Sequence, residues 1–382
     1  MATVPSNVRR FQEAMQRVYG PIAEAAATPQ AAERWVPPDK PGAGGHRGRY
    51  LWTDAFGVLN LITLYRETGS ATYLQLARRL VRTVHDVLGS TRDGSSRLPG
   101  ATDAEPLRGG LRIGKAEARG PDGDGQYHHY LTLWMFALNR LALAAGEPAY
   151  NALAVQLAEA VHPRFVLRGP GGEAARMVWK VSADMREVLV PSEGHLDAAT
   201  GYVVCGLLRE AAERFGQTDR ERQPVLENEM DDYRELMGRG GGRAHMAASR
   251  DMLDLGMGLW ACHFLRDKEE WAAKLGGESV EIAKEVLREG GGGILAKDPG
   301  RRLAFREFGT CLGLRCYNNS FGGEDGRDEG LEERVAALVG FWEKYMEESL
   351  DEEDLRPITL VMYAAALIPG AFQRGYFDDK AD

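Results

Sequence analysis

The stretch Arg49-Tyr-Leu-Trp-Thr-Asp54-Ala-Phe-Gly57 decides the fold, because a polar and aromatic opening leads directly into small and apolar residues. The same pattern opens every second one of twelve helix-length segments. Backbone N–H groups at a helix start lack partners within the helix, so such a start can satisfy a buried polar group. Six alternate helices of this kind predict the inner ring of a helical toroid. The other five starts are Asp124–His129, Glu193–Gly201, Arg250–Gly258, Phe305–Gly313 and Arg356–Thr359.

The segments between these predicted inner helices have a different distribution of charged and apolar residues. Segments 220–237 and 329–348 carry dense charge on one face and an apolar stripe on the other, which is typical of a helix half in water. Segment 356–372 is apolar nearly all round and is expected to be enclosed. The alternation predicts an all-α (α/α)6 toroid of twelve helices in two concentric rings, as a single domain over residues 1–382. The predicted helices cover 5–27, 50–68, 71–89, 126–145, 148–163, 196–215, 220–237, 250–266, 268–289, 303–317, 329–348 and 356–372.

Two connections are too long to be simple turns. They cover residues 90–125 and 164–195. Within the second, alternating residues near 176–191 predict a short β-hairpin inserted before the third inner helix. Long ordered loops often build or cover binding sites, so we expect both at the mouth of the toroid.

Composition excludes several classes of function. With 382 residues, 44% of them hydrophobic and 27% charged, the chain can bury a large core. A net charge of -9 without a basic stripe argues against nucleic acid or an anionic membrane as partner. No apolar run reaches transmembrane length and the N-terminus lacks the apolar region of a secretory signal, so we predict a cytoplasmic protein.

The cysteines indicate packing rather than chemistry. All four lie among glycine and alanine on predicted inner helices, where a free thiol behaves as a small buried apolar group. No Cys/His spacing matches a zinc site. We therefore predict four packing residues: Cys205, Cys262, Cys311 and Cys316. We assign no metal and no cofactor, although the plentiful Asp and His side chains leave metal binding open.

Asp54 lies in the first turn of the first predicted inner helix, close to Arg49, Tyr50 and Trp52. A carboxylate at this position can simply stabilise the helix start. It can also act as an acid or base in the cavity. Aromatic, carboxylate and arginine side chains together are typical of a surface that binds polyols, so we favour a catalytic Asp54 with Arg49 and Trp52 as substrate-binding residues.

The densest polar cluster opens the second inner helix, at Asp124-Gly-Gln-Tyr-His-His129. Asp124 and His128 are four residues apart, so on a helix they share one face and could share a proton. A helix cap followed by a core histidine is the alternative. We predict Asp124 as catalytic and Gln126, Tyr127 and His128 as substrate-binding.

The third inner helix opens with three titratable groups within five residues, Glu193, His195 and Asp197. A plain surface turn would also explain them. We predict these three as catalytic and Lys180, on the hairpin, as substrate-binding. The remaining helix starts add further predicted substrate-binding residues by their position: His245, Asp251, Glu307 and Arg356.

The inner-helix openings resemble the six-hairpin glycosidase-like superfamily. The stretches that carry the resemblance are Trp-Thr-Asp-Ala-Phe-Gly57, Asp124-Gly-Gln-Tyr and Gly194-His-Leu-Asp197. That group includes unsaturated glucuronyl hydrolases, many inverting glycosidases and, on a related toroid, the N-acylglucosamine 2-epimerases. The resemblance covers most of the chain as architecture and matches the catalytic motif of no single family.

The resemblance implies two sets of catalytic residues. In the glucuronyl hydrolases two aspartates on successive inner helices act as acid and base, which implies Asp54 and Asp124 here. In the epimerases, histidines on inner helices move the proton, and His128, His195 and His245 are the corresponding residues.

The sequence therefore predicts a carbohydrate-active enzyme, with a glycoside hydrolase as the leading hypothesis. Paired carboxylates in the central cavity would cleave the glycosidic bond, and inversion needs a separation of about 6.5–9.5 Å between them. Trp52 and Tyr127 would stack on the sugar. Three alternatives stay open: a sugar epimerase or isomerase using cavity histidines, a lyase or cyclase of secondary metabolism, and a non-catalytic sugar-binding toroid. The substrate and the oligomeric state are not predicted.

Overall fold

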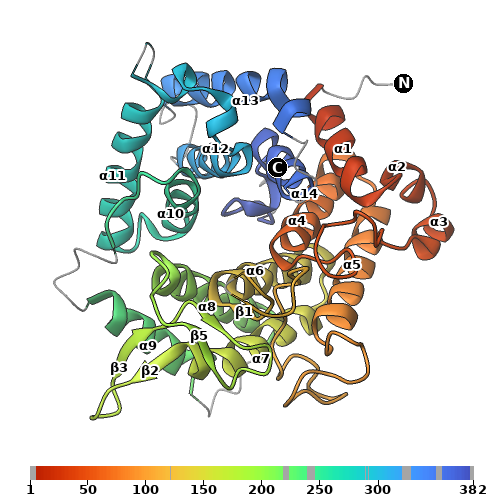
Figure 1. Cartoon of the computed structure of the whole chain (residues 1–382), viewed down its shortest axis with the longest axis vertical. Coiled ribbons are helices and arrows are strands. Elements are labelled where there is room, and N and C mark those ends of the chain that lie inside the picture. Colours follow the sequence, from red (N-terminus) through yellow and green to blue (C-terminus); the bar gives the residue numbers. More distant parts are fainter. Residues whose placement is uncertain are drawn as a thin grey trace. The chain divides into compact units, whose positions relative to one another are not determined.

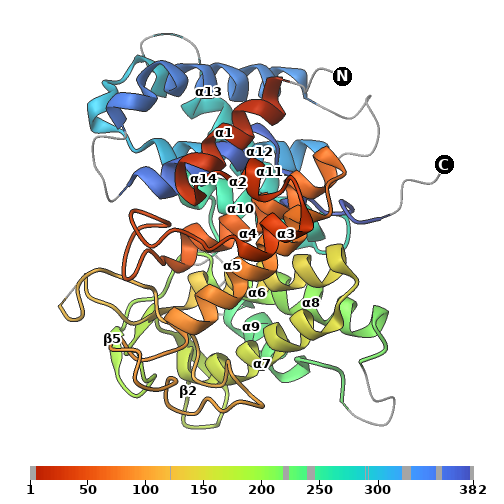
Figure 2. The same cartoon turned by 90° about the vertical axis from the view of Figure 1, so that its right-hand side faces the viewer.

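The chain is mostly helical in the computed structural model, which describes residues 6–120, 122–217, 223–238, 246–288, 290, 292–320, 328–349 and 355–378. These residues form fourteen α-helices and two small antiparallel sheets (Figures 1 and 2). The predicted all-α class, with a small β insertion, is confirmed.

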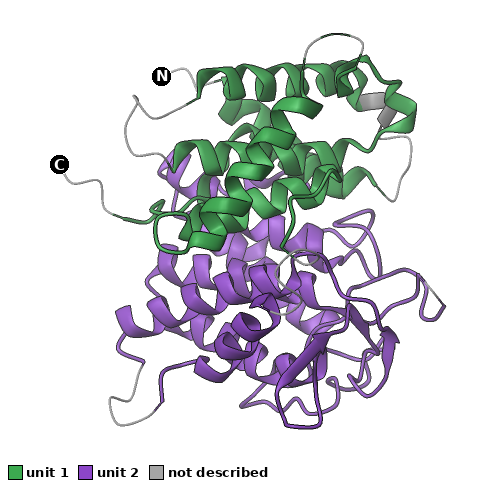
Figure 3. Cartoon of the chain, turned by 90° about the vertical axis from the view of Figure 1, so that its left-hand side faces the viewer, with its two compact units in different colours: residues 1–18, 246–382 green, residues 19–245 purple. Residues whose placement is uncertain are grey.

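The contacts divide the chain into two compact units (Figure 3). Unit 1 comprises Met1–Val18 and Met246–Asp382, and unit 2 comprises Tyr19–His245. Each unit contains three of the predicted inner helices. The prediction that these two sets of inner helices complete one toroidal ring in a single domain stays a prediction.

Unit 2 alternates enclosed and half-exposed helices. All residues from Leu51 to Leu64 of α4 are buried, whereas α5 buries only an amphipathic stripe. The enclosed helices pack in a row, α4 on α6 and α6 on α8, with α5, α7 and α9 against them. The helices of this unit are α2 (Ile22–Ala25), α3 (Pro29–Arg34), α4 (Leu51–Thr68), α5 (Thr72–Leu88), α6 (His128–Ala145), α7 (Pro148–Phe165), α8 (Asp197–Arg214) and α9 (Glu227–Gly238).

Unit 1 repeats the arrangement, with α12 packed between α10 and α14. Glycine allows α10 and α12 to cross closely: a Cβ at Gly256 would lie 2.1 Å from the carbonyl oxygen of Gly309. The helices are α1 (Ser6–Tyr19, whose last residue falls in unit 2), α10 (Met252–Leu265), α11 (Glu270–Val286), α12 (Ala304–Asn319), α13 (Glu329–Ser349) and α14 (Arg356–Leu367), with single 3-10 turns at Ile294–Ala296, Pro299–Arg301 and Gly370–Phe372.

Two predicted helices were too long. The predicted helix 5–27 breaks after α1, because Gly20 adopts a left-handed conformation (φ 74°) and Pro21 has no N–H to continue the ladder. The predicted helix 356–372 ends at Leu367. Pro369 follows two residues later, and it disfavours helical backbone at Ile368, which is extended.

The predicted hairpin near 176–191 is only partly correct. Strands β4 (Lys180–Val181) and β5 (Val188–Val190) pair as expected, and β1 (Gln126–Tyr127) adds a third strand on β4. Arg176 and Met177 belong instead to β3 (Ala174–Met177), which pairs with β2 (Val166–Arg168). Both sheets and the long loops gather at one end of unit 2 (Figure 2).

All four cysteines are buried and none forms a disulfide in the described structure, in agreement with the packing interpretation. Among the helices that the structure describes, none combines the length and apolarity that a membrane crossing requires.

Candidate functional site

The starts of α4 and α6 and the loop before β4 bring six ring-bearing side chains together in unit 2. We call these Tyr50, Trp52, Tyr127, His129, Tyr130 and Trp179 the aromatic cluster. The rings of Tyr127, His129 and Trp179 stack pairwise, with centroids 5.2–5.8 Å apart. Tyr130 joins them to the first helix, since its ring lies 5.2 Å from Trp52 and its hydroxyl is 2.7 Å from that of Tyr50.

The aromatic cluster runs from solvent into the core. Trp179 is 37% exposed and Trp52 only 4%. The indole N–H of Trp52 is buried without a hydrogen-bond partner among the described residues. Because an unsatisfied buried donor is uncommon and costly, this N–H is a candidate contact for a ligand oxygen.

Asp197 faces the aromatic cluster from the start of α8. Its Oδ1 lies 3.9 Å from Nδ1 of both His128 and His129, and its buried Oδ2 has no partner in the described structure. Burial alone would raise the pKa of Asp197, but the hydrogen bond from His128 and the nearby imidazoles of His128 and His129 outweigh it and hold the pKa below its usual range. Asp197 is therefore an ionised acceptor at neutral pH.

His129 is the complementary donor. Burial lowers its pKa to about 4, against a smaller opposing effect of Asp197, so the imidazole is neutral at pH 7. Its Nδ1 accepts the indole N–H of Trp179 at 3.1 Å. A neutral imidazole that accepts through Nδ1 carries its proton on Nε2. With its side chain 27% exposed, His129 can offer that proton to a ligand.

His128 has a supporting position. It is 1% exposed, and its Nε2 lies 2.8 Å from the hydroxyl of Tyr233. Burial keeps the pKa of Tyr233 well above its ordinary value, so the phenol stays protonated. His128 therefore lies between Tyr233 and Asp197, and the substrate-binding role predicted for it stays a prediction.

Asp54 is held in a closed ion-pair network. Its Oδ1 accepts from Arg49 Nη1 at 2.8 Å and from the Tyr19 hydroxyl at 3.1 Å, and its Oδ2 accepts the backbone N–H of Tyr50 at 3.3 Å. Both partners of the ion pair are almost fully buried, and the second Arg49 nitrogen donates to Pro38 O at 2.5 Å. These contacts favour a structural role for Arg49 and Asp54. The catalytic role of Asp54 and the binding role of Arg49 stay predictions.

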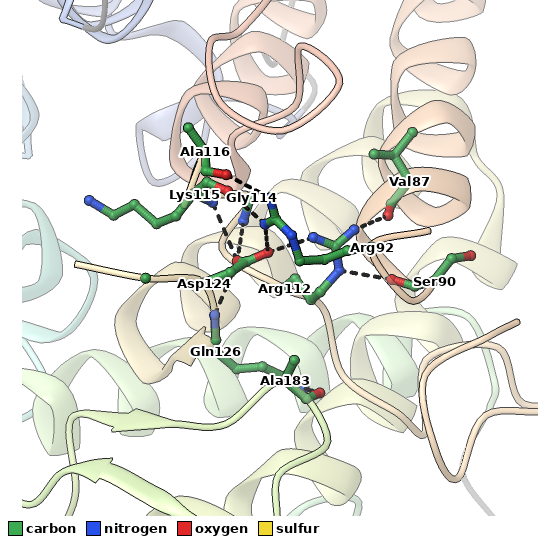
Figure 4. Close-up of polar contacts among 12 residues, drawn as sticks. Val87, Ser90, Arg92, Arg112, Gly114, Lys115, Ala116, Asp124, Gln126 and Ala183 are labelled. Carbon is green, nitrogen blue, oxygen red and sulfur yellow. Dashed lines mark hydrogen bonds and ion pairs between the residues drawn. The ribbon is translucent and has the colours of Figure 1, made fainter. Parts of the chain in front are cut away.

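Asp124 organises the long loop 90–125 (Figure 4). Its Oδ2 accepts from Arg92 at 2.8 Å and from Arg112 at 2.6 Å. Its Oδ1 accepts the backbone N–H groups of Gly114, Lys115 and Gly125. With two cations and three amides on one buried carboxylate, no acceptor position remains for a substrate. The catalytic role predicted for Asp124 stays untested, and its contacts favour loop support.

Three more predicted residues lie in the same unit, and their predicted roles stay predictions. Gln126 is fully buried and ties the loop to the hairpin, donating to Gly109 O and Ala183 O. Glu193 accepts the backbone N–H of Met177 at 3.0 Å. His195 is half-buried in the turn before α8. Lys180 does border the cluster, with Nζ 5.2 Å from the centre of the Tyr127 ring.

The other predicted residues lie in unit 1 or outside the described structure. Asp251 caps α10, accepting from the N–H groups of Leu253 and Asp254, and pairs with Arg306. Glu307 is buried in an ion pair with Arg302 and accepts from Trp342 Nε1 at 2.7 Å. Arg356 begins α14. His245 lies outside the described residues.

Four members of the aromatic cluster were not predicted as site residues: Tyr50, which was noted only as a neighbour of Asp54, and His129, Tyr130 and Trp179. His129 and Tyr130 directly follow the predicted Tyr127 and His128, so a scan for adjacent aromatic residues would have found them. Trp179 had no such signal. It reaches Tyr127 only because β1 pairs with β4, the strand that follows Trp179.

A metal-dependent site has no support in the described residues. No group of three or more His, Cys, Asp or Glu side chains in them has an arrangement that could hold an ion. The side chains of the aromatic cluster can stack on a ligand and donate hydrogen bonds to it, and the ionised Asp197 can accept a proton from it.

Comparison with known proteins gives little guidance. No family model matches the chain, and no curated protein matches it. Among solved structures, it is similar to a crystal structure of a sugar epimerase from a ruminal bacterium, with 12% sequence identity and a TM-score of 0.47, over 78% of this chain and 75% of that one. A likeness of this degree does not establish what this chain does.

Proposed function

We propose that the chain is a carbohydrate-active enzyme that binds a sugar on the aromatic cluster and moves a proton at a carbon next to the carbonyl group, as a sugar epimerase or isomerase does. The observation that carries the proposal is a pair of buried, unpartnered polar atoms beside one imidazole. Asp197 Oδ2 is an acceptor and Trp52 Nε1 is a donor, and both residues contact His129. Sugar hydroxyls both donate and accept, so a sugar can satisfy both atoms.

The two neighbouring groups have complementary tasks. The ionised carboxylate of Asp197 accepts the proton from carbon. The Nε2–H of His129 donates to the carbonyl oxygen, on which negative charge develops as the enediol forms. In an isomerisation the proton returns from Asp197 to the neighbouring carbon. In an epimerisation the enediol turns its opposite face to Asp197 before the proton returns to the same carbon, because return to the original face regenerates the substrate. The base and the donor stay in these charge states because their environments move the two pKa values in the required directions.

The contacts favour this reaction over glycoside hydrolysis. Hydrolysis needs two carboxyl groups on either side of the scissile bond. Asp54 is buried against Arg49, and the oxygens of Asp124 are occupied by arginines and amides. Asp197 is then the one predicted carboxylate that faces the aromatic cluster with a free oxygen, within the described residues.

The test is proton exchange with solvent. Reducing sugars are incubated with the protein in deuterated water, and NMR follows loss of the proton next to the carbonyl carbon. Asp197→Asn and His129→Gln should each slow exchange by about 100- to 10,000-fold, the range for losing a general acid or base. Asp86→Asn, which changes an exposed aspartate in the same unit, is the matched control.

Other outcomes would assign a different function. Cleavage of glycosides without deuterium incorporation would support the hydrolase. Sugar binding with neither exchange nor cleavage would support a non-catalytic binding protein, in which Asp197→Asn lowers affinity alone.

A further inference from the structure

Lys115 places an ammonium group beside the aromatic cluster. Its Nζ lies 5.8 Å from the centre of the Tyr50 ring. The backbone N–H of Lys115 binds Asp124, whereas its side chain extends away from that carboxylate (Figure 4). The side chain is half-buried and forms no ion pair with the described residues. The loop anchored by Asp124 thus presents a cation at the edge of the cluster.

Lys180 adds a second positive charge from a buried position next to the aromatic cluster. It is fully buried, its Nζ donates to Gly123 O at 2.5 Å, and the ammonium lies 5.2 Å from the Tyr127 ring centre. Burial and then the charge of Lys115 lower the pKa of Lys180, and Asp124 and Asp122 oppose this. The two ammonium groups therefore act on each other, and Tyr50 and Tyr127, the tyrosines beside them, both contact Tyr130.

The surrounding loop adds to the positive potential. Arg92 and Arg112 share the single carboxylate of Asp124, which cannot neutralise both. In the same loop region, burial and then the charges of Arg92, Arg112 and Arg47 lower the pKa of His46, and Asp124 opposes them. The whole chain has a net charge of -9, so this group of cations is a local feature, and Asp122 is a carboxylate that opposes it at Tyr127 and Lys180.

We infer that the sugar bound at the aromatic cluster carries an anionic group, a carboxylate or a phosphate, and that Lys115 binds it. This rests on the proposed function and specifies its substrate class. The ring of Tyr50 gives Lys115 a cation–π contact but no hydrogen-bond acceptor, so its three N–H donors are available to an anion. Lys180 strengthens binding through its field, since its buried ammonium already donates to the backbone.

Binding of matched sugars tests the inference without knowledge of the reaction. The protein is titrated with glucose, galactose and mannose, with their uronates and with their 6-phosphates. Binding is followed by tryptophan fluorescence, to which Trp52 and Trp179 contribute at the site. The anionic form of one sugar should bind at least tenfold more tightly than its neutral form at low salt, and added sodium chloride should reduce the difference. The uronate and the phosphate arms distinguish the two anionic groups.

Variants at Lys115 locate the effect. Lys115→Gln should remove the preference for the anionic form while the neutral sugar binds as before, and Lys115→Arg should retain the preference. Lys274→Gln, an exposed lysine on α11, is the matched control and should change neither.

The outcomes separate the inference from the proposed function. Equal affinity for neutral and anionic sugars, or a preference that survives Lys115→Gln, overturns the inference and leaves the proposed function standing. If neither form of any sugar binds, the proposed function fails and the inference fails with it.

Discussion

Asp197 Oδ1 lies 3.9 Å from Nδ1 of His129, although the two residues belong to different helices of unit 2. Each helix contributes the residue at or beside its first turn. The packing of α6 on α8 therefore sets how far the carboxylate of Asp197 lies from the imidazole of His129. A pair placed on rigid elements keeps its geometry better than one placed on loops.

Both groups should keep one charge state across neutral pH. The pKa of His129 is lowered to about 4 and that of Asp197 lies below its usual range. We expect the imidazole carbon resonances of His129, assigned by comparison with His129→Gln, to be unchanged between pH 8 and pH 5.5. A titration of His129 near pH 6.5 would contradict the proposed assignment of donor and base.

The low pKa of His129 also links folding to pH. A histidine whose folded pKa lies below its unfolded value of 6.5 stabilises the fold fully above pH 6.5, and the contribution is lost as the pH falls toward 4. Urea unfolding of the wild type should therefore weaken over this window more steeply than that of His129→Gln. Equal slopes for the two proteins would show that His129 has an ordinary pKa in the fold.

Asp54 should have the opposite pH dependence. Burial, opposed by Arg49 and by hydrogen bonds from Tyr19 and Tyr50, raises the pKa of Asp54 from 3.8 to about 6. An acid whose folded pKa is raised binds more protons in the fold, so its contribution is present at low pH and falls as the pH rises from about 4 to about 6. The expected loss is about 3 kcal/mol at most.

Two substitutions test this role of Asp54. Asp54→Asn keeps an acceptor for Arg49 and should remove the pH-dependent loss, as measured by urea unfolding at pH 4.5 and 7. Asp54→Ala leaves a buried guanidinium unpaired and should cost about 3–5 kcal/mol. A stable Asp54→Ala protein would mean that the ion pair is not structural.

The helices could largely be predicted from the sequence because their determinants are local. The apolar stripe of α5 and the continuous apolar body of α4 are visible in the residues themselves. The break after α1 also has a local determinant, Gly20 followed by Pro21. The pairing of β2 with β3 was not predicted, since Val166–Arg168 continues directly from α7 without a turn signal.

The site was predictable by region but not by residue. An aspartate at a helix start looks the same whether it binds substrate or pairs with an arginine. The tertiary structure gives the three aspartates different partners. Asp54 contacts Arg49 and Tyr19, Asp124 contacts two arginines, and Asp197 lies near two histidines. Long-range partners such as Arg112 and Trp179 have no fixed sequence spacing from the groups that they contact.

Asp124 should determine the order of the loop that carries Lys115. Asp124→Ala leaves Arg92 and Arg112 without their carboxylate and removes the acceptor for three backbone amides. We expect faster hydrogen exchange and proteolysis in residues 90–125, with the helices of unit 1 unaffected. Asp103→Asn, at an exposed position in the same loop, should leave the exchange unchanged.

The crossing of α10 and α12 should be intolerant of any side chain. Gly256→Ala places a Cβ 2.1 Å from a backbone oxygen, so the helices must separate, at a cost of about 3 kcal/mol. Gly277→Ala, on an exposed face of α11 with nothing within 4 Å, should instead stabilise by about 0.5–1 kcal/mol. Thermal unfolding of both variants checks the contrast.

Trp52 offers a way to separate binding from stability. Trp52→Phe keeps an aromatic ring but removes an indole N–H that has no partner in the described structure, so the free energy of unfolding should change little. Sugar affinity should fall about tenfold, the equivalent of one hydrogen bond of about 1.4 kcal/mol. Trp134→Phe is the matched control, because the N–H of Trp134 donates to His85 at 3.1 Å. In this variant the free energy of unfolding should fall and the sugar affinity should stay unchanged. If the two variants behave alike in both assays, the Trp52 N–H is not a ligand contact and the aromatic cluster loses its main polar donor for the sugar.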